Sequence, residues 1–188
     1  SNDAEAAGAC VMCETDLVGI EPRAEGYLLT TRRAAGDTYR FATRALINCA
    51  GLAADAVAAL AGIPVDACGY RLRYSKGEYV SVRPSERTQF KHLIYPARSN
   101  GARGLGIHVT IDLEGRVFLG PDANFVERER ADYSVSGDKR ADFCEATRHF
   151  LPFITPEMLE PAFAGIRPRL SAPGEPQRDF VIAHEAGR

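Results

Sequence analysis

Arg167 is placed where a guanidinium could hold an anion. It lies in the stretch GIRPRL, between an apolar strand and a proline that cannot donate to a sheet ladder, so its side chain leaves the sheet where regular pairing is interrupted. A forked donor in that position suits a carboxylate or a phosphate. The alternative is that Arg167, or its neighbour Arg169, is an ion-paired surface arginine.

His108 lies in the stretch GLGIHVTID, in which apolar and other residues alternate. Alternation places Gly106, His108 and Thr110 on one face of a strand and puts the apolar side chains on the other. Because an imidazole titrates near neutral pH, a histidine on the face away from the core is suited to proton transfer. A hydrogen-bonded structural histidine is the alternative.

A lysine, a glycine and a tyrosine form a third candidate group in the stretch SKGEYVSV. The alternation puts Gly77, Tyr79 and Ser81 on one face, with Lys76 at its edge. Glycine in a strand permits a flat ring to approach the backbone closely, and a plain β-bulge is the alternative.

The stretch RALINCAGLAADAVAALAG, residues 44–62, reads as a buried strand that ends on Ala50-Gly51 and turns into an alanine-rich helix from Leu52 to Ala61. Free N–H groups and the positive dipole end of such a helix suit a phosphate. The usual first half of a nucleotide-binding unit, a strand followed by G-x-G-x-x-G, does not occur in the sequence. The pattern therefore predicts the second half of such a unit.

The other elements must position these residues. Residues 8–51 alternate and contain glycine turns, which predicts a three-stranded meander, and the chain over 69–120, including KHLIYPAR at 91–98, holds short strands with hairpin-length gaps that predict an antiparallel sheet. Helical spacing over 138–151 and a cap-plus-proline start at Thr155-Pro156 predict helices that cover this sheet. The end of the chain reads as a strand, a proline-rich loop and a strand. The fold class is α+β.

The composition excludes several classes of protein. The 188 residues include 23 basic and 25 acidic side chains, interspersed to a net charge of −2, which argues against nucleic-acid binding. No apolar run approaches the roughly 20 residues of a transmembrane helix, and the polar start lacks a signal peptide, so we expect a cytoplasmic protein. The five cysteines are expected to be reduced, and the pair Cys10 and Cys13 has no second pair, so no metal site is predicted.

Four stretches together resemble the middle portion of FAD-dependent oxidoreductases of the D-amino-acid oxidase superfamily, closest to the L-2-hydroxyglutarate oxidase or dehydrogenase branch. They are ALINCAGLAAD, KGEYVSV, LIYPAR followed by GLGIHVTIDLEGRVFLGPD, and GIRPRLSAPGEPQRDFVI. The resemblance implies an FAD cofactor and an antiparallel substrate-binding sheet with flanking helices, joined to the second half of a Rossmann-like FAD domain.

The resemblance also implies roles for residues that bind the cofactor. Val18 matches the residue whose backbone meets the adenine ring, and Ala50 and Gly51 match the turn that lies against the ribose and diphosphate. The N-terminal G-x-G-x-x-G unit and the C-terminal helix that caps the flavin are missing from the pattern. An internal fragment of a larger enzyme is therefore expected, inactive alone and, with bare sheet edges, prone to self-association.

For the substrate, the resemblance implies that Arg167 holds a carboxylate or phosphate, that Tyr79 and the preceding Lys76 face the pocket, and that His108 is the candidate base. All four are expected to converge on one side of the sheet. The whole enzyme would oxidise a small 2-hydroxy acid, similar to L-2-hydroxyglutarate, by hydride transfer to FAD. A relative that oxidises glycerol 3-phosphate or an amino acid is the alternative, and the isolated chain could also be a non-catalytic module that binds an anion or a partner.

The implied domain plan has three parts. Residues 1–67 form a partial FAD-binding domain, 68–164 form the substrate-binding sheet with its covering helices, and 165–188 form return strands toward the FAD domain. The enzyme that contains them is expected in the cytoplasm, peripheral to the inner membrane.

Overall fold

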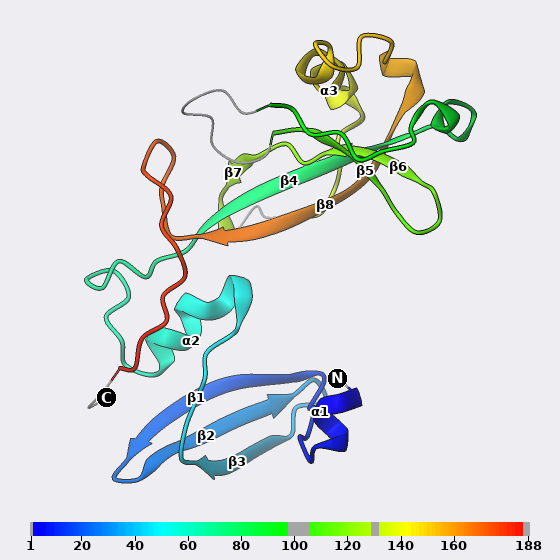
Figure 1. Ribbon diagram of the computed structural model, residues 1–188. Helices are drawn as coiled ribbons and strands as arrows, with labels where there is room; N and C mark the ends of the chain where they lie inside the picture. Colours follow the sequence, from blue (N-terminus) through cyan, green and yellow to red (C-terminus); the bar gives the residue numbers. More distant parts are fainter. Residues whose placement is uncertain (1, 98–105, 129–131, 186–188) are drawn as a thin grey trace. The chain divides into compact units, whose positions relative to one another are not determined.

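The computed structural model describes residues 2–97, 106–128 and 132–185, and the chain divides into two compact units (Figure 1). Unit 1 comprises Ser1–Leu72 and Asp179–Arg188. Unit 2 comprises Arg73–Arg178.

Unit 1 contains the predicted meander. After the short helix α1 (Asn2–Ala6), strands β1 (Thr15–Arg23), β2 (Gly26–Arg33) and β3 (Thr38–Thr43) pair antiparallel in the order β1-β2-β3. Gly26 is required at the β1–β2 turn, because its φ is +98° and a Cβ there would lie 2.1 Å from the Thr43 carbonyl oxygen. The glycine turns and alternation thus specify this sheet locally.

The predicted buried strand over 44–50 is wrong. These residues form no strand, and Ile47 is 83% exposed. An apolar strand of this kind is buried only when neighbours cover it on both sides. None of the strands in the described ranges pairs with it.

The predicted helix after Gly51 is present, as a 3-10 turn (Gly51–Ala53) that continues into α2 (Ala54–Leu60). The residues that α2 buries are Asp55 and Ala58. The Asp55 carboxylate accepts the Leu72 N–H at 3.3 Å and lies 3.6 Å from the Arg71 guanidinium. A polar residue therefore faces inward, where its hydrogen bonds are satisfied.

Unit 2 is built on a five-stranded antiparallel sheet in its described residues. Its strands are β4 (Arg73–Val82), β5 (His108–Ile111), β6 (Val117–Gly120), β7 (Asn124–Val126) and β8 (Leu159–Arg169). The order is β5-β6-β4-β7, and β8 pairs with β4 along its whole length. The long strand β4 therefore lies at the centre, with β8 at an edge.

The core lies on one face of this sheet. Helix α3 (Arg140–Thr147), preceded by a 3-10 turn (Gly137–Lys139), lies over that face and buries Phe143 (Figure 1). The fully or almost fully buried partners are apolar residues of alternating strand positions and of the segment after α3: Val80, Val82, Val109, Val117, Leu119, Leu151 and Leu159. The predicted helix at Thr155-Pro156 is only a 3-10 turn (Pro156–Met158), and another such turn spans Pro84–Gln89.

Two further strand predictions fail. Within 91–97 the only strand pairing is a single bridge between Ile94 and Val109. Residues 179–185, in the predicted last return strand, form no strand, and Ile182 is 94% exposed. As at 44–50, the described part of the chain supplies no strand to pair with them.

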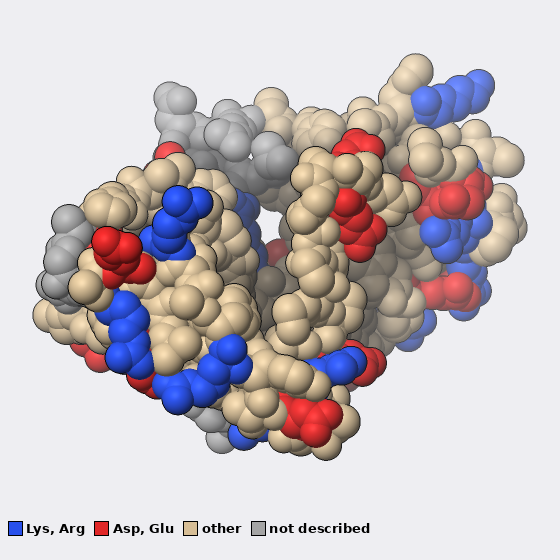
Figure 2. Space-filling model, turned by 90° about the horizontal axis from the view of Figure 1, so that it is seen from below, with Lys and Arg blue, Asp and Glu red and all other residues tan. Residues whose placement is uncertain are grey.

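Charges of both signs are interspersed on the face that Figure 2 shows, separated by broad uncharged areas. Among the described residues, no helix is long and apolar enough to cross a membrane, and no three His, Cys, Asp or Glu side chains are grouped to hold a metal. All five cysteines are free.

Candidate functional site

The face of the unit 2 sheet opposite the core carries a row of aromatic rings, and we call it the aromatic face. His108 on β5 pairs with Gly120 on β6, and Tyr79 on β4 pairs with Phe163 on β8. A Cβ on Gly120 would lie 2.5 Å from Tyr79 Cδ1, which makes Gly120 and Tyr79 direct neighbours. His108, Gly120, Tyr79 and Phe163 therefore form one row across four strands.

Stacking holds these rings in place. Tyr79 and Phe163 stack with centroids 4.6 Å apart, Phe118 meets Phe163 edge-on at 5.4 Å, and Tyr95 stacks on His108 at 4.5 Å. Burial raises the pKa of the Tyr79 phenol above its ordinary value, and the charge of Tyr95 adds to the rise. Tyr79 is therefore a neutral hydrogen-bond donor at physiological pH.

His108 is only 7% exposed, and its Nδ1 lies 2.9 Å from the carbonyl oxygen of Gly106. Because a carbonyl oxygen only accepts, Nδ1 must carry the proton in this hydrogen bond. The neutral ring then holds its lone pair on Nε2. The backbone of Gly106 thus selects the tautomer in which His108 can accept a proton at Nε2.

Gly120 is essential to this row, because its φ is +150° and a Cβ would meet both Tyr79 Cδ1 at 2.5 Å and the Glu78 carbonyl oxygen at 2.9 Å. We expect Gly120→Ala to displace the Tyr79 ring and to lower the free energy of unfolding by about 1–3 kcal/mol. Gly165→Ala is the matched control, since a Cβ at Gly165 meets nothing within 4 Å. Thermal unfolding of both variants checks this; equal melting temperatures would contradict it.

Arg167 lies on the same face, farther along the edge strand. It pairs with Ser75, four residues from Phe163, which is about 13 Å of strand. The intervening pair is Gly77 opposite Gly165, so no side chain of these two strands rises between the aromatic row and Arg167. Arg167 is exposed.

Lys76 does not lie on the aromatic face. The prediction that it shares one face with His108, Tyr79 and Arg167 is therefore wrong. Successive strand residues point to opposite faces, so Lys76 lies with Glu78 and Val80 on the core face. Its Nζ is 3.3 Å from Glu78 and 3.1 Å from Asp132. Burial opposes its charge, but hydrogen bonds to Asp132 and Glu78 outweigh burial and raise the pKa of Lys76.

Lys139 completes this buried charge network, which the sequence did not reveal. Its Nζ lies 3.1 Å from Glu78 Oε2 and 2.8 Å from Asp122 Oδ2, while Asp122 Oδ1 accepts the Glu78 N–H at 2.7 Å. The network ties the segment after β6 to β4. It thereby supports Gly120 in its position beside Tyr79.

The predicted cofactor residues lie in unit 1. The β1–β2 register passes from Leu17 opposite Thr31 to Gly19 opposite Thr30, so Val18 is a bulge residue without a cross-strand partner. At the turn before α2, Gly51 has a φ of +56°, and a Cβ there would meet nothing within 4 Å.

Asn48 braces that turn, and sequence reasoning missed it. Its Oδ1 accepts the Ala50 N–H at 3.2 Å, and its Nδ2 donates to the Ala54 carbonyl at 2.7 Å. An asparagine two residues before a turn N–H is a recognisable signal of this arrangement. The exposed Ala50-Gly51 backbone beside open space fits close contact with part of a nucleotide such as FAD.

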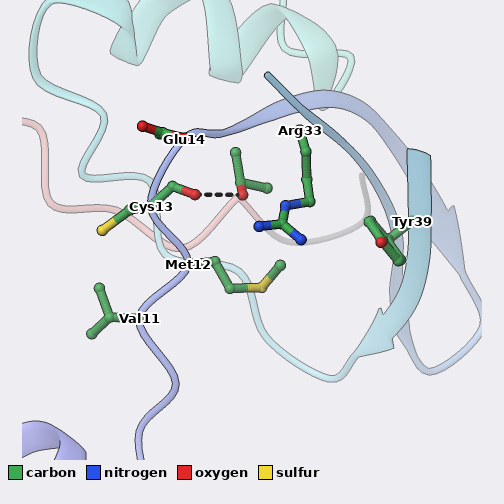
Figure 3. A pocket seen from close by; sticks show the side chains of 7 residues that line it. Val11, Met12, Cys13, Glu14, Arg33 and Tyr39 are labelled. Atoms are coloured by element: carbon green, nitrogen blue, oxygen red, sulfur yellow. Dashed lines mark hydrogen bonds between the residues drawn. The ribbon is translucent and has the colours of Figure 1, made fainter. Parts of the chain in front are cut away.

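Unit 1 also has an open pocket of about 530 Å³, lined by residues that include Met12, Cys13, Arg33 and Tyr39 (Figure 3). The Thr15 hydroxyl donates to the Cys13 carbonyl at 2.9 Å beside it. None of the predicted cofactor residues lines this pocket.

A strand meander, a glycine turn into a helix, and an antiparallel sheet with one aromatic face are the features that the resemblance to FAD-dependent oxidoreductases leads us to expect. The chain belongs to the FAD dependent oxidoreductase (DAO) family, whose model matches residues 1–188. The predicted fold class and FAD dependence are thereby confirmed at the level of the family.

Individual relatives agree with this assignment. The chain is 35% identical over 153 residues to the mitochondrial L-2-hydroxyglutarate dehydrogenase of Arabidopsis thaliana, covering 74% of this chain and 30% of that enzyme. Its fold is similar to glycine oxidase from Geobacillus kaustophilus (TM-score 0.65, 23% identity, 98% of this chain and 43% of that chain). It is also similar to glycerol-3-phosphate dehydrogenase from Bacillus halodurans complexed with FAD (TM-score 0.64, 20% identity, 88% and 33%).

Proposed function

We propose that the enzyme containing this chain oxidises a small 2-hydroxy acid, similar to L-2-hydroxyglutarate, by hydride transfer to FAD. The observation that carries the proposal is the arrangement of the aromatic face, where a histidine with its lone pair on Nε2 shares a sheet face with the exposed Arg167. The 35% identity to an L-2-hydroxyglutarate dehydrogenase supports this substrate over others.

Three residues of the aromatic face have proposed roles in this reaction. Arg167 grips the substrate carboxylate with two parallel hydrogen bonds. Tyr79, neutral at physiological pH, donates a hydrogen bond from its phenol. His108 accepts the hydroxyl proton at Nε2 as the C–H hydrogen leaves with its electron pair and the carbonyl forms. FAD, when bound, supplies the acceptor for that hydride.

The cofactor contacts proposed for unit 1 are backbone contacts at Val18, Ala50 and Gly51. These are few, and the described residues contain no glycine-rich diphosphate loop. We therefore expect the isolated 188-residue chain to bind FAD weakly or not at all. Titration followed by flavin fluorescence measures this, and a sub-micromolar dissociation constant would contradict it.

Self-association of the isolated chain stays a prediction. The unpaired segments 44–50 and 179–185, with Ile47 and Ile182 exposed, supply surfaces that suit it. The cytoplasmic location and the peripheral membrane position of the enzyme also stay predictions.

The test of the function is anaerobic reduction of the FAD-loaded whole enzyme. L-2-hydroxyglutarate, glycerol 3-phosphate and glycine are mixed with it in turn, and loss of oxidised-flavin absorbance is followed. We expect rapid loss of oxidised-flavin absorbance with L-2-hydroxyglutarate and not with the other two compounds. Reduction by glycerol 3-phosphate or glycine instead would assign the alternative substrate class, and no reduction by any of the three would overturn the proposal.

A further inference from the structure

Two more arginines lie beside Arg167 on the aromatic face. Arg73 opens β4 and Arg169 ends β8, and these two residues are directly opposite each other. Arg167 is two residues from Arg169 along β8. The β4–β8 register is regular from Arg73 to Tyr79, so all three arginines share a face with Tyr79.

This arginine cluster has no balancing charge in the part of the chain that the structure describes. Among the described residues, no acidic side chain forms an ion pair with any of the three, although Arg71, Arg83, Arg116 and Arg148 all have such partners. Like charges directly opposite in an antiparallel pair are destabilising. Three guanidinium groups on neighbouring positions, without an acidic partner among the described residues, therefore favour a bound anion.

The spacing of the cluster suits an anion with two charged ends. Arg167 lies one row from the Arg73–Arg169 pair, about 7 Å along the strand. That is the order of the separation between the end carboxylates of an extended five-carbon dicarboxylate. Gly165, at which a Cβ would meet nothing within 4 Å, leaves space beside Arg167 on the side of the aromatic row.

We propose that Arg73 and Arg169 hold the distal carboxylate of a dicarboxylate substrate, while Arg167 holds the carboxylate beside the reacting carbon. The assignment rests on the proposed function and adds the residues that determine specificity. If Arg73 and Arg169 bind the distal carboxylate, the enzyme prefers a 2-hydroxy dicarboxylate to a 2-hydroxy monocarboxylate of equal chain length.

The test compares two substrates in the whole FAD-loaded enzyme, L-2-hydroxyglutarate and L-2-hydroxypentanoate, which has a methyl group in place of the distal carboxylate. We expect Arg169→Leu and Arg73→Leu each to lower kcat/KM about tenfold to a hundredfold for the dicarboxylate and less than about twofold for the monocarboxylate. Arg83→Leu is the matched control, because Arg83 pairs with Glu160 just beyond the other end of β4. It should leave the preference unchanged.

Equal losses on both substrates would overturn the assignment, and a concurrent loss of FAD affinity would show that the cluster holds a cofactor phosphate instead. Binding of glutarate and pentanoate by calorimetry gives a readout without turnover. If glutarate binding requires Arg73 and Arg169 but the enzyme oxidises no 2-hydroxy acid, the proposed function is overturned and the arginine assignment is not. Oxidation that persists without any selective loss in Arg169→Leu would overturn the arginine assignment alone.

Discussion

Replacing His108 with asparagine is expected to lower kcat for the 2-hydroxy acid by about 10²- to 10⁴-fold, the range typical of a lost general base. The hydrogen bond from Nδ1 to the Gly106 carbonyl leaves Nε2 as the only ring atom that can accept the hydroxyl proton. Asparagine keeps an N–H donor for Gly106 but has no basic nitrogen. The fold should therefore survive while proton transfer fails.

The measurement is the rate of anaerobic flavin reduction at saturating substrate, with a melting curve for each variant. His149→Asn is the control, since His149 is exposed and contacts Phe150 edge-on away from the aromatic row. If His108→Asn reduced its flavin at the rate of the unmodified enzyme, His108 would be a structural histidine. A matched fall in melting temperature would point the same way.

Elements with local signals could be predicted from sequence. The glycine turns and alternation of residues 15–43 specify the meander, and the spacing of Phe143 and Thr147 predicts α3, because those patterns depend on neighbouring residues alone. The segments 44–50 and 179–185 have equally strong strand patterns. These segments form no strand because a strand needs a hydrogen-bonded partner, and none of the strands in the described residues pairs with them.

The candidate site depends on register, which a single sequence does not reveal. Alternation correctly placed Tyr79 on the face away from the core. The same rule puts Lys76 on the core face, whereas the sequence-based prediction placed Lys76 at the edge of the face that carries Tyr79. That His108 and Tyr79 share a row follows from the pairing of β5, β6 and β4. The Arg73–Arg169 pair also joins residues 96 positions apart in sequence, through the β4–β8 register.

Replacing Arg167 with lysine in the whole enzyme is expected to lower kcat/KM for L-2-hydroxyglutarate about tenfold to a hundredfold with little effect on folding. Lysine keeps the positive charge but loses the planar fork that can bind a carboxylate through two parallel hydrogen bonds. The loss corresponds to about 1.5–3 kcal/mol of transition-state binding. Arg167 is exposed and has no acidic partner among the described residues, so folding should change by less than about 0.5 kcal/mol.

Steady-state kinetics together with a melting curve separate the two roles that Arg167 could have. Because lysine still attracts the carboxylate but orients it poorly, kcat should fall along with kcat/KM, and Arg167→Met should lose more than Arg167→Lys. A kcat/KM that decreases in the order Arg, Lys, Met at position 167 indicates that both the charge and the geometry of the side chain act on the carboxylate beside the reacting carbon. Unchanged kcat/KM with a lowered melting temperature would instead make Arg167 a structural residue of the β8 edge.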